Sequence, residues 1–270
     1  MQTDPILFPH RLKHLQDVEM TAFISAMFAY GNVAAMKKFL EQLFYEFGSS
    51  PVFNLLHKKV KGSNLYYRFQ NSDDVKTLIY ALREIYICTM SEDRTFEGII
   101  LQDDLGGGEL KRGQDHAASL HKKSAEFYGV LNSFSARGNN HLADRIDRLR
   151  SALLDSVPMQ KQTQGYRHLI GAGSEQSARK RYCMFFRWMT RKGFPDFHIY
   201  RNQKSSELVI PLDTHIMKVS QKLGLRTRNT PNWTTAIEIT ENLKKIDPED
   251  PLKYDFALTR PGILREIFPV

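Results

Sequence analysis

The sequence predicts an all-α protein with two helical lobes, and three observations favour this fold class. Apolar residues recur every three or four positions in successive segments, which is the spacing of one face of a helix. Capping residues and glycines separate these segments, and strand-like apolar runs appear in one short stretch only. A chain of 270 residues that is 41% hydrophobic can also bury a core without disulfides or metal ions.

The first third of the chain is predicted to form three helices. The first begins near the capping residue Asp17, runs to Ala29 and ends at Gly31. The second carries an apolar stripe at every fourth position: Ala35, Phe39, Leu43 and Phe47. The third begins at Asp73 and buries a face made of Leu78, Leu82 and Ile85.

The middle of the chain alternates loops with helices. Residues 106–108 are three glycines and predict a loop, but not a phosphate-binding loop, because no Gly-Lys-Ser or Gly-Lys-Thr follows them. Amphipathic helices are expected over residues 116–135 and 142–154. The polar, glycine-containing stretch 157–173 marks a boundary in the organisation of the chain.

The C-terminal part is predicted to be helical again. Ser174 is a suitable N-cap for a heavily buried helix that runs to Lys192. Residues 197–211 predict either a short hairpin or an irregular loop. Three further helices are expected, which begin after Asp213, at Pro231 and at Asp250.

The charge balance favours a polyanionic partner. Thirty-eight Lys and Arg against thirty Asp and Glu give a net charge of +8. Such an excess is typical of proteins that bind nucleic acid, although a merely basic protein would show it as well.

Cysteine usage and hydropathy exclude several classes of protein. Cys88 and Cys183 are not in a CxxC pair and are too few for a four-cysteine cluster. We therefore expect reduced thiols in a cytoplasmic protein with no metal and no cofactor. No apolar run is long enough to cross a membrane, and the first residues lack a signal-peptide pattern, so no membrane partner is expected.

Basic residues are concentrated between positions 179 and 204. This segment holds eight Lys and Arg residues against the single acid Asp196, a net charge of +7. Interleaved aromatic residues strengthen the prediction of a phosphate-binding surface with salt-sensitive affinity. A solvated basic helix face is the alternative interpretation.

Lys180 is the candidate nucleophile within this segment. It lies at the edge of the apolar face of its helix, where partial desolvation would favour the neutral amine. Its side chain can equally extend to solvent and have no chemical role.

Asp213 is the candidate catalytic carboxylate. It follows Pro211 and precedes an amphipathic segment that Gly224 ends, which predicts an N-cap. A capping carboxylate is rigidly held and ionised. It can therefore stabilise the positive charge that develops on a sugar when a glycosidic bond breaks, or exchange a proton with a lysine.

The segment around Asp213 carries a resemblance to a known superfamily. Ile210-Pro211-Leu212-Asp213-Thr214-His215-Ile216, with Val219 and Leu223-Gly224-Leu225, resembles the catalytic segment of helix-hairpin-helix DNA glycosylases of the endonuclease III type. The whole chain also resembles a bacterial family catalogued as a domain of unknown function. That resemblance rests on segments such as Asp4-Pro5, Ala29-Tyr30-Gly31, Arg179-Lys180-Arg181 and Asp247-Pro248-Glu249-Asp250-Pro251.

The superfamily resemblance implies a lysine partner for Asp213, and the chain departs from the usual pattern. Residues 169–173 include Gly171 and Gly173, a hairpin-like Gly-x-Gly, but the position of the usual lysine then holds Glu175. The archaeal 8-oxoguanine glycosylases are similar to this chain in placing the lysine on a long helix about thirty residues before the aspartate. Lys180 lies 33 residues before Asp213 and fits that arrangement.

The resemblance implies a single glycosylase-like unit over residues 1–270. Its middle helical lobe spans 30–190 and its second lobe joins 1–29 to 214–270. A helix-hairpin-helix-like element and a cleft between the lobes complete the expected architecture.

The implied function is excision of a damaged base, such as an oxidised purine, from duplex DNA by a monomer with AP-lyase activity. Lys180 would form the Schiff base and Asp213 would stabilise the cation. The expected nucleic-acid-binding residues are Gly171, Gly173, Ser174, Arg179, Arg181, Arg187 and His215. Trp188 and Phe186 would either stack on the flipped base or belong to the core. The alternatives are a catalytically inactive nucleic-acid-binding module of the same fold, or action on RNA or a nucleoside.

Overall fold

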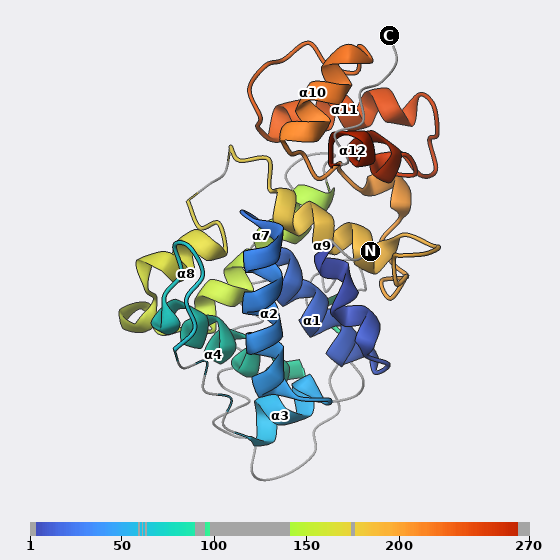
Figure 1. The fold of residues 1–270 in the computed structure, drawn as a ribbon. Helices are drawn as coiled ribbons and strands as arrows, with labels where there is room; N and C mark the ends of the chain where they lie inside the picture. The colour runs from blue at the N-terminus through green and yellow to red at the C-terminus, as the bar shows by residue number, and fades with distance from the viewer. Residues whose placement is uncertain are drawn as a thin grey trace. The chain divides into compact units, whose positions relative to one another are not determined.

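The computed structural model describes residues 4–58, 60, 62, 64–89, 95–97, 141–173 and 176–263, and the protein is all-α (Figure 1). No strand occurs in these ranges. Strand-like pairing within them is limited to two isolated bridges, Tyr67 with Gln70 and Ser177 with Asn232. No helix in the described part of the chain is long and apolar enough to cross a membrane.

Residues 1–172 form the first of two compact units. Its α-helices are α1 (Leu15–Met27), α2 (Val33–Phe47), α3 (Pro51–His57), α4 (Ser72–Thr89), α7 (His141–Asp155) and α8 (Gln164–Leu169). Short 3₁₀ helices are η1 (Pro5–Leu7), η2 (Pro9–Arg11) and η3 (Met159–Lys161). Helix α1 packs against η1, η2 and α3, while α4 packs against α3, α7 and α8.

Helix α1 forms the centre of this unit and buries two acidic side chains. The Asp17 carboxylate accepts the backbone N–H of Val52 at 2.7 Å, which anchors the first turn of α3. The fully buried Glu19 accepts the Tyr86 hydroxyl at 3.2 Å and the N–H of Phe96 at 2.8 Å. Burial, followed by the negative charge of Glu19, raises the pKa of Tyr86 well above its usual value.

Residues 173–270 form the second unit. It contains α9 (Lys180–Thr190), the 3₁₀ helix η4 (Ser205–Glu207), α10 (Thr214–Lys222), α11 (Trp233–Lys244) and α12 (Asp255–Ile263). Helix α10 packs against α12. The rings of Phe185, Phe186 and Tyr200 pack together with centroids about 6 Å apart, so the long loop after α9 folds back over that helix.

Hydrophobic periodicity located most helices of the described chain, but it missed α3, and it missed α8 within the stretch 157–173 that was predicted to be a boundary. The predicted face of α4 is buried, and so are Phe39, Leu43 and Phe47 of α2, whereas Ala35 is exposed and Met36 is buried in its place. Helix α7 occupies the predicted stretch around 142–154. Residues 197–211, for which the sequence allowed a hairpin or an irregular loop, form an irregular loop with one 3₁₀ turn. The expected triple-glycine loop and the helix at 116–135 lie outside the described residues.

Four predicted helix starts are wrong. Helix α1 begins at Leu15 after the N-cap His14, so Asp17 lies inside its first turn, and α11 begins at Trp233 after the N-cap Asn232 rather than at Pro231. The other two starts differ by five residues or more. Helix α9 begins at Lys180, six residues after Ser174, because Ser177 instead pairs in a β-bridge with Asn232 ahead of α11. The last helix begins at Asp255 rather than Asp250, because residues 251–254 form a turn first.

The compact units do not have the boundaries predicted for the lobes. They divide between Ala172 and Gly173, whereas the sequence predicted lobes of 30–190 and of 1–29 with 214–270. Helix α1 belongs to the first unit. The packing of the N-terminal helix on the C-terminal helices and a cleft between lobes stay predictions.

Candidate functional site

The second unit brings Lys180 and Asp213 together. Lys180 is the first residue of α9, and Asp213 is the N-cap of α10. The Lys180 ammonium lies 3.6 Å from Oδ2 of Asp213, and the two side chains remain 35% and 21% exposed. The pair is therefore formed where two helices begin, and both of its members can be reached by a ligand.

Asp213 is held rigidly by its own helix. Its backbone is extended, with φ −128° and ψ −176°, and its Oδ1 accepts the N–H groups of His215 and Ile216, each at 2.9 Å. This is the capping geometry predicted from the sequence. One carboxylate oxygen is thus used for the helix, and the other faces Lys180.

The chain before Lys180 is fixed by residues from α11. The N–H of Trp233 donates to the carbonyl of Gln176 at 3.2 Å, beside the bridge between Ser177 and Asn232. Arg179, the N-cap of α9, takes a left-handed backbone with φ 50°, and its guanidinium lies 5.1 Å from the centre of the Trp233 ring. These contacts with the start of α11 hold the chain before α9 and so position the Lys180 backbone within the second unit.

A buried network of charges occupies the remainder of α9. Arg187 pairs with Asp255, the first residue of α12, and its Nε lies 3.6 Å from Oδ2 of Asp196. Arg191 donates to the same Asp196 oxygen at 2.6 Å and binds Asp250 through Nε and one terminal nitrogen at 2.8–3.1 Å. The network ties α9 to the loop that follows it and to the start of α12.

The buried network interacts electrostatically with the Lys180–Asp213 pair, because the charges of Asp255 and Asp213 affect each other. Burial raises the pKa of Asp255; the positive charge of Arg187 opposes that rise, and the negative charge of Asp213 adds to it. Asp213 therefore has two charged neighbours of opposite sign, Lys180 on its exposed side and the buried Asp255. Burial likewise raises the pKa of Asp196, against the effect of the two arginines.

Three residues predicted for ligand contact are buried, and those predictions are corrected. Arg187 is 5% exposed and neutralised by Asp255, so it does not reach a phosphate. Phe186 is fully buried against Phe185 and Tyr200, and Trp188 is 2% exposed, so both rings belong to the core rather than to the wall of a base pocket. The apolar stripe of α9 has a packing role.

The predicted basic surface is also smaller than the sequence indicated. Arg187 and Arg191 together account for two of the eight basic residues in segment 179–204, and both are buried. Their charges are balanced by Asp196, Asp250 and Asp255, two of which lie far outside the segment.

The predicted glycine hairpin is only partly available to a ligand. Gly171 has a left-handed backbone, with φ 71°, and its N–H already donates to the carbonyl of His168 at 3.1 Å, which completes the end of α8. Gly173, with φ 78°, is exposed, and its N–H remains a candidate phosphate donor. Ser174 lies outside the described residues.

Arg179, Arg181 and His215 stay candidates for nucleic-acid contact. All three are half-buried and flank Lys180 or Asp213 in the chain, at the starts of α9 and α10.

Asp255 and Trp233 are two site residues that sequence reasoning missed. Asp255 was expected to lie inside a helix, and Trp233 was not considered. The local sequence features near them are the two Asp-Pro pairs before Asp255 and the capping residue Asn232 before Trp233. Neither feature shows that these residues lie close to Arg187 and Arg179.

The arrangement can supply an amine, a fixed carboxylate and flanking positive charge. No group of three or more His, Cys, Asp or Glu that could hold a metal ion occurs in the described part of the chain.

Comparison with known families gives one match over nearly the whole chain. The model of the family described as "Protein of unknown function (DUF2400)" matches residues 4–264. The chain belongs to this family. Neither a curated protein nor a solved structure gives a significant match. The matched residues of this DUF2400 protein include Lys180, Asp213 and the whole buried network from Arg187 to Asp255.

Proposed function

We propose that this DUF2400 protein is a DNA glycosylase with AP-lyase activity, in which Lys180 is the nucleophile and Asp213 is the stabilising carboxylate. The single observation that carries the proposal is the 3.6 Å approach of Lys180 Nζ to Asp213 Oδ2, with both side chains partly exposed. The two residues lie 33 positions apart in the chain. The likeness of the Asp213 segment to helix-hairpin-helix glycosylases supports the same chemistry.

The proposed reaction begins at C1′ of the damaged nucleotide. The Lys180 ammonium first releases a proton to solvent. The neutral amine then attacks C1′, the bond from C1′ to the base breaks, and the base leaves with the bonding electrons and takes up a proton. Oδ2 of Asp213 stabilises the positive charge on the sugar and accepts a proton from the attacking nitrogen. The C1′–O4′ bond then breaks, O4′ takes up the proton held by Asp213, and an iminium ion forms between Nζ and C1′.

The second step of the proposed reaction cleaves the strand. A base removes a proton from C2′ of the iminium, the 3′ C–O bond breaks, and the 3′ phosphate leaves. Hydrolysis of the iminium releases Lys180 for another cycle. Because Asp213 is fixed by two backbone N–H groups, no reorientation of the carboxylate is needed as the charge develops.

The proposed substrate is damaged duplex DNA with an extrahelical base, such as an oxidised purine, bound by a monomer in the cytoplasm. Arg179, Arg181, His215 and the N–H of Gly173 are the groups proposed to contact its phosphates. The net charge of +8 supports a polyanionic substrate.

Borohydride trapping tests the proposal directly. The full-length protein is incubated with a duplex that contains one abasic site, and sodium borohydride is added to reduce any iminium to a stable covalent complex. We expect a trapped complex with the wild-type protein and none with Lys180→Ala. Asp213→Asn should keep the helix cap and lower the trapping rate by about 10²-fold or more.

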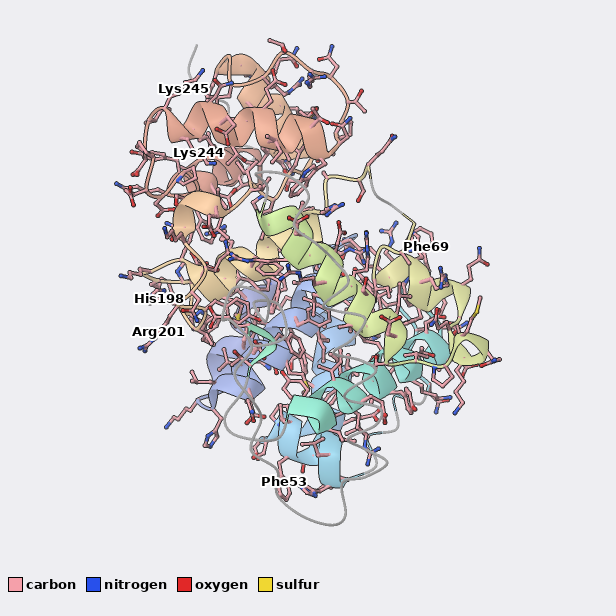
Figure 2. The ribbon with its side chains drawn as sticks, turned by 180° about the vertical axis from the view of Figure 1, so that it is seen from behind. Phe53, Phe69, His198, Arg201, Lys244 and Lys245 are labelled. Atoms are coloured by element: carbon pink, nitrogen blue, oxygen red, sulfur yellow. The ribbon has the colours of Figure 1, made fainter. Side chains whose placement is uncertain are left out.

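Lys244→Ala is the matched control. Lys244 is 32% exposed, close to the 35% of Lys180, and it also pairs with a carboxylate, Glu241, at 2.7 Å (Figure 2). Trapping should be unchanged in this variant. Equal trapping by Lys180→Ala and wild type would reject the proposal.

The alternative is a binding module of the same fold without catalysis. The Lys180–Asp213 pair is compatible with such a module, because an ion pair between two helix starts can have a purely structural role. In the same experiment such a module would bind the duplex and give neither trapping nor strand cleavage.

A further inference from the structure

A hollow in the first unit has no part in the proposed lyase chemistry. It measures about 470 Å³ and is lined by the turn before α4, the first turn of α4 and one side of α8, including Phe69, Asn71, Gln164 and His168. This volume falls in the range of small-molecule sites, about 300–1,000 Å³. We call it the Phe69 hollow.

The turn that carries Phe69 is built to hold the ring outward. Tyr67 and Gln70 exchange backbone hydrogen bonds of 2.9 and 3.0 Å, which leaves Arg68 and Phe69 at the tip of a tight loop. Arg68 takes a left-handed backbone with φ 54°, and the Phe69 ring is 64% exposed. The Tyr30 hydroxyl binds the Gln70 amide and the Tyr67 hydroxyl binds the Tyr30 carbonyl, so the base of the loop is anchored in the unit.

Polar groups at the hollow are pre-arranged by buried contacts. Asp74 is 2% exposed, and its carboxylate accepts the Thr163 hydroxyl at 2.5 Å and the Asn71 N–H at 2.8 Å. The Asn71 side-chain oxygen caps α4 by accepting the N–H groups of Asp73 and Asp74. The Asn71 amide nitrogen finds no acceptor within the described ranges, which leaves it as a donor for a ligand.

The close approach of α8 to Asp74 depends on Gly165. A Cβ at this position would lie 2.1 Å from Oδ2 of Asp74, so any other residue would push the two walls apart.

Two side chains contact the Phe69 ring, the cation Arg68 and the imidazole of His168. The Arg68 guanidinium lies 5.3 Å from the centre of the Phe69 ring, and the ring of the exposed His168 meets it edge-on at 5.9 Å. An exposed aromatic face with an adjacent guanidinium and an amide donor suits a planar heteroaromatic ring that has a hydrogen-bonding edge and an attached phosphate.

We propose that the Phe69 hollow binds one unpaired nucleobase, stacked on Phe69, with its edge at Asn71 and its phosphate at Arg68. The ligand is a free nucleotide or a base of a single-stranded nucleic acid, which share this chemistry. The site lies in the first unit and needs no damaged base, so it is independent of the lyase proposal.

Binding of undamaged ligands tests the hollow. AMP is titrated by calorimetry, and a fluorescein-labelled single strand of twelve deoxyadenosines by anisotropy, into the full-length protein. Phe69→Ala should weaken both affinities roughly 5- to 100-fold, and Phe69→Tyr should restore them. Asn71→Asp, which keeps the cap oxygen and removes the donor, should weaken both as well.

Phe53→Ala is the control. Phe53 is 57% exposed and also contacts a histidine, His57, at 4.6 Å, but it lies on α3, well away from Phe69 in the same unit (Figure 2). We expect no change in either affinity. Tighter binding of the strand, with steep salt dependence, would identify a strand as the source, and tighter binding of AMP would identify a free nucleotide.

Two outcomes would overturn the proposal. One is that neither ligand binds, or that Phe69→Ala and Phe53→Ala change the affinities equally. The other is that Phe69→Ala changes the oligomeric state on size-exclusion chromatography without changing either affinity, because Phe69 would then be a protein contact. Unchanged thermal unfolding of the Phe69 variants shows that they remain folded.

Discussion

At the scale of single residues, Asp213 divides its two oxygens between two tasks. Oδ1 accepts two backbone N–H groups of α10, and Oδ2 faces the Lys180 ammonium. The capping task is common to many aspartates, and in the proposed reaction it would hold the second oxygen in place. A carboxylate that could rotate freely would lose entropy each time it aligned with a developing charge.

The Cys183 thiol on α9 is strongly desolvated. Its side chain is fully buried, and burial raises the pKa of the thiol to about 12 from 9.0. The folded protein therefore keeps the proton through a pH range in which the unfolded chain loses it. Stability falls as the pH rises from about 9 towards 12.

We expect the unfolding free energy of wild type, relative to Cys183→Ala, to fall by about 1 kcal/mol between pH 9 and pH 10. Urea denaturation of both proteins, each in a Cys88→Ser background, measures this difference. The same thiol should resist a thiol reagent until the protein unfolds. A difference that does not change with pH, or rapid labelling of the native protein, would contradict the prediction.

At the scale of elements, α9 combines a partly exposed first residue with a buried body. Lys180 is its first residue, whereas Arg187 and Arg191 lie on later turns and are neutralised inside the second unit. Asp255 supplies the partner of Arg187 from the first turn of α12. The position of α9 relative to α12 therefore depends on a buried ion pair.

Asp255→Ala should destabilise the protein strongly. It leaves the Arg187 side chain, which is 6% exposed, with the 3.6 Å approach of Asp196 and the Phe256 ring, 4.5 Å away, to compensate its charge. Breaking a buried pair by removing one partner costs about 3–5 kcal/mol. Asp255→Asn should cost less, because burial already disfavours the charged form of this side chain.

Glu241→Ala is the comparison for Asp255→Ala. Glu241 is 56% exposed and pairs with Lys244 on the surface of α11, so its loss should change stability by less than about 0.5 kcal/mol. Chemical denaturation of the three variants gives the ranking. Similar losses for Asp255→Ala and Glu241→Ala would mean that the buried network contributes little to the fold.

At the scale of the whole molecule, net charge is a poor guide to where a polyanion binds. The chain carries +8, yet Arg187 and Arg191 are buried and paired with Asp196, Asp250 and Asp255. The candidate phosphate contacts that remain in the second unit, such as Arg181, lie at helix starts beside Lys180.

Salt dependence measures these contacts. We expect the logarithm of the affinity for a duplex to fall linearly with the logarithm of the salt concentration, with a slope of about −0.9 for each neutralised phosphate. Arg181→Gln should reduce the slope by about 0.9 if it neutralises one phosphate. Arg11→Gln, which breaks an exposed pair with Glu41 in the first unit, is the control and should leave the slope unchanged. Equal slopes for Arg181→Gln and wild type would remove Arg181 from the contact surface.

Most of the helices of the described chain were predictable, because their stability depends on local periodicity and caps. The stripe from Ala35 to Phe47, the Asn32 cap found ahead of it and the Asp213 cap are properties of residues within a few turns of one another. The starts of α9 and α12 were not predictable. Ser174 and Asp250 are good caps by residue type. Contacts with distant residues instead delay both helices, because Ser177 pairs with Asn232 and Asp250 binds Arg191.

By itself the sequence determined the all-α class, the helix cap at Asp213 and the choice of Lys180 as its candidate partner, because residue type, periodicity and a likeness in the chain carry that information. Only the tertiary structure decided that Lys180 and Asp213 meet at 3.6 Å, that Arg187, Phe186 and Trp188 are buried, and that Phe69 stands exposed over a hollow. The physical reason is that burial and charge compensation depend on residues distant in sequence. Asp255 neutralises Arg187 from 68 positions away, and no local pattern encodes that contact.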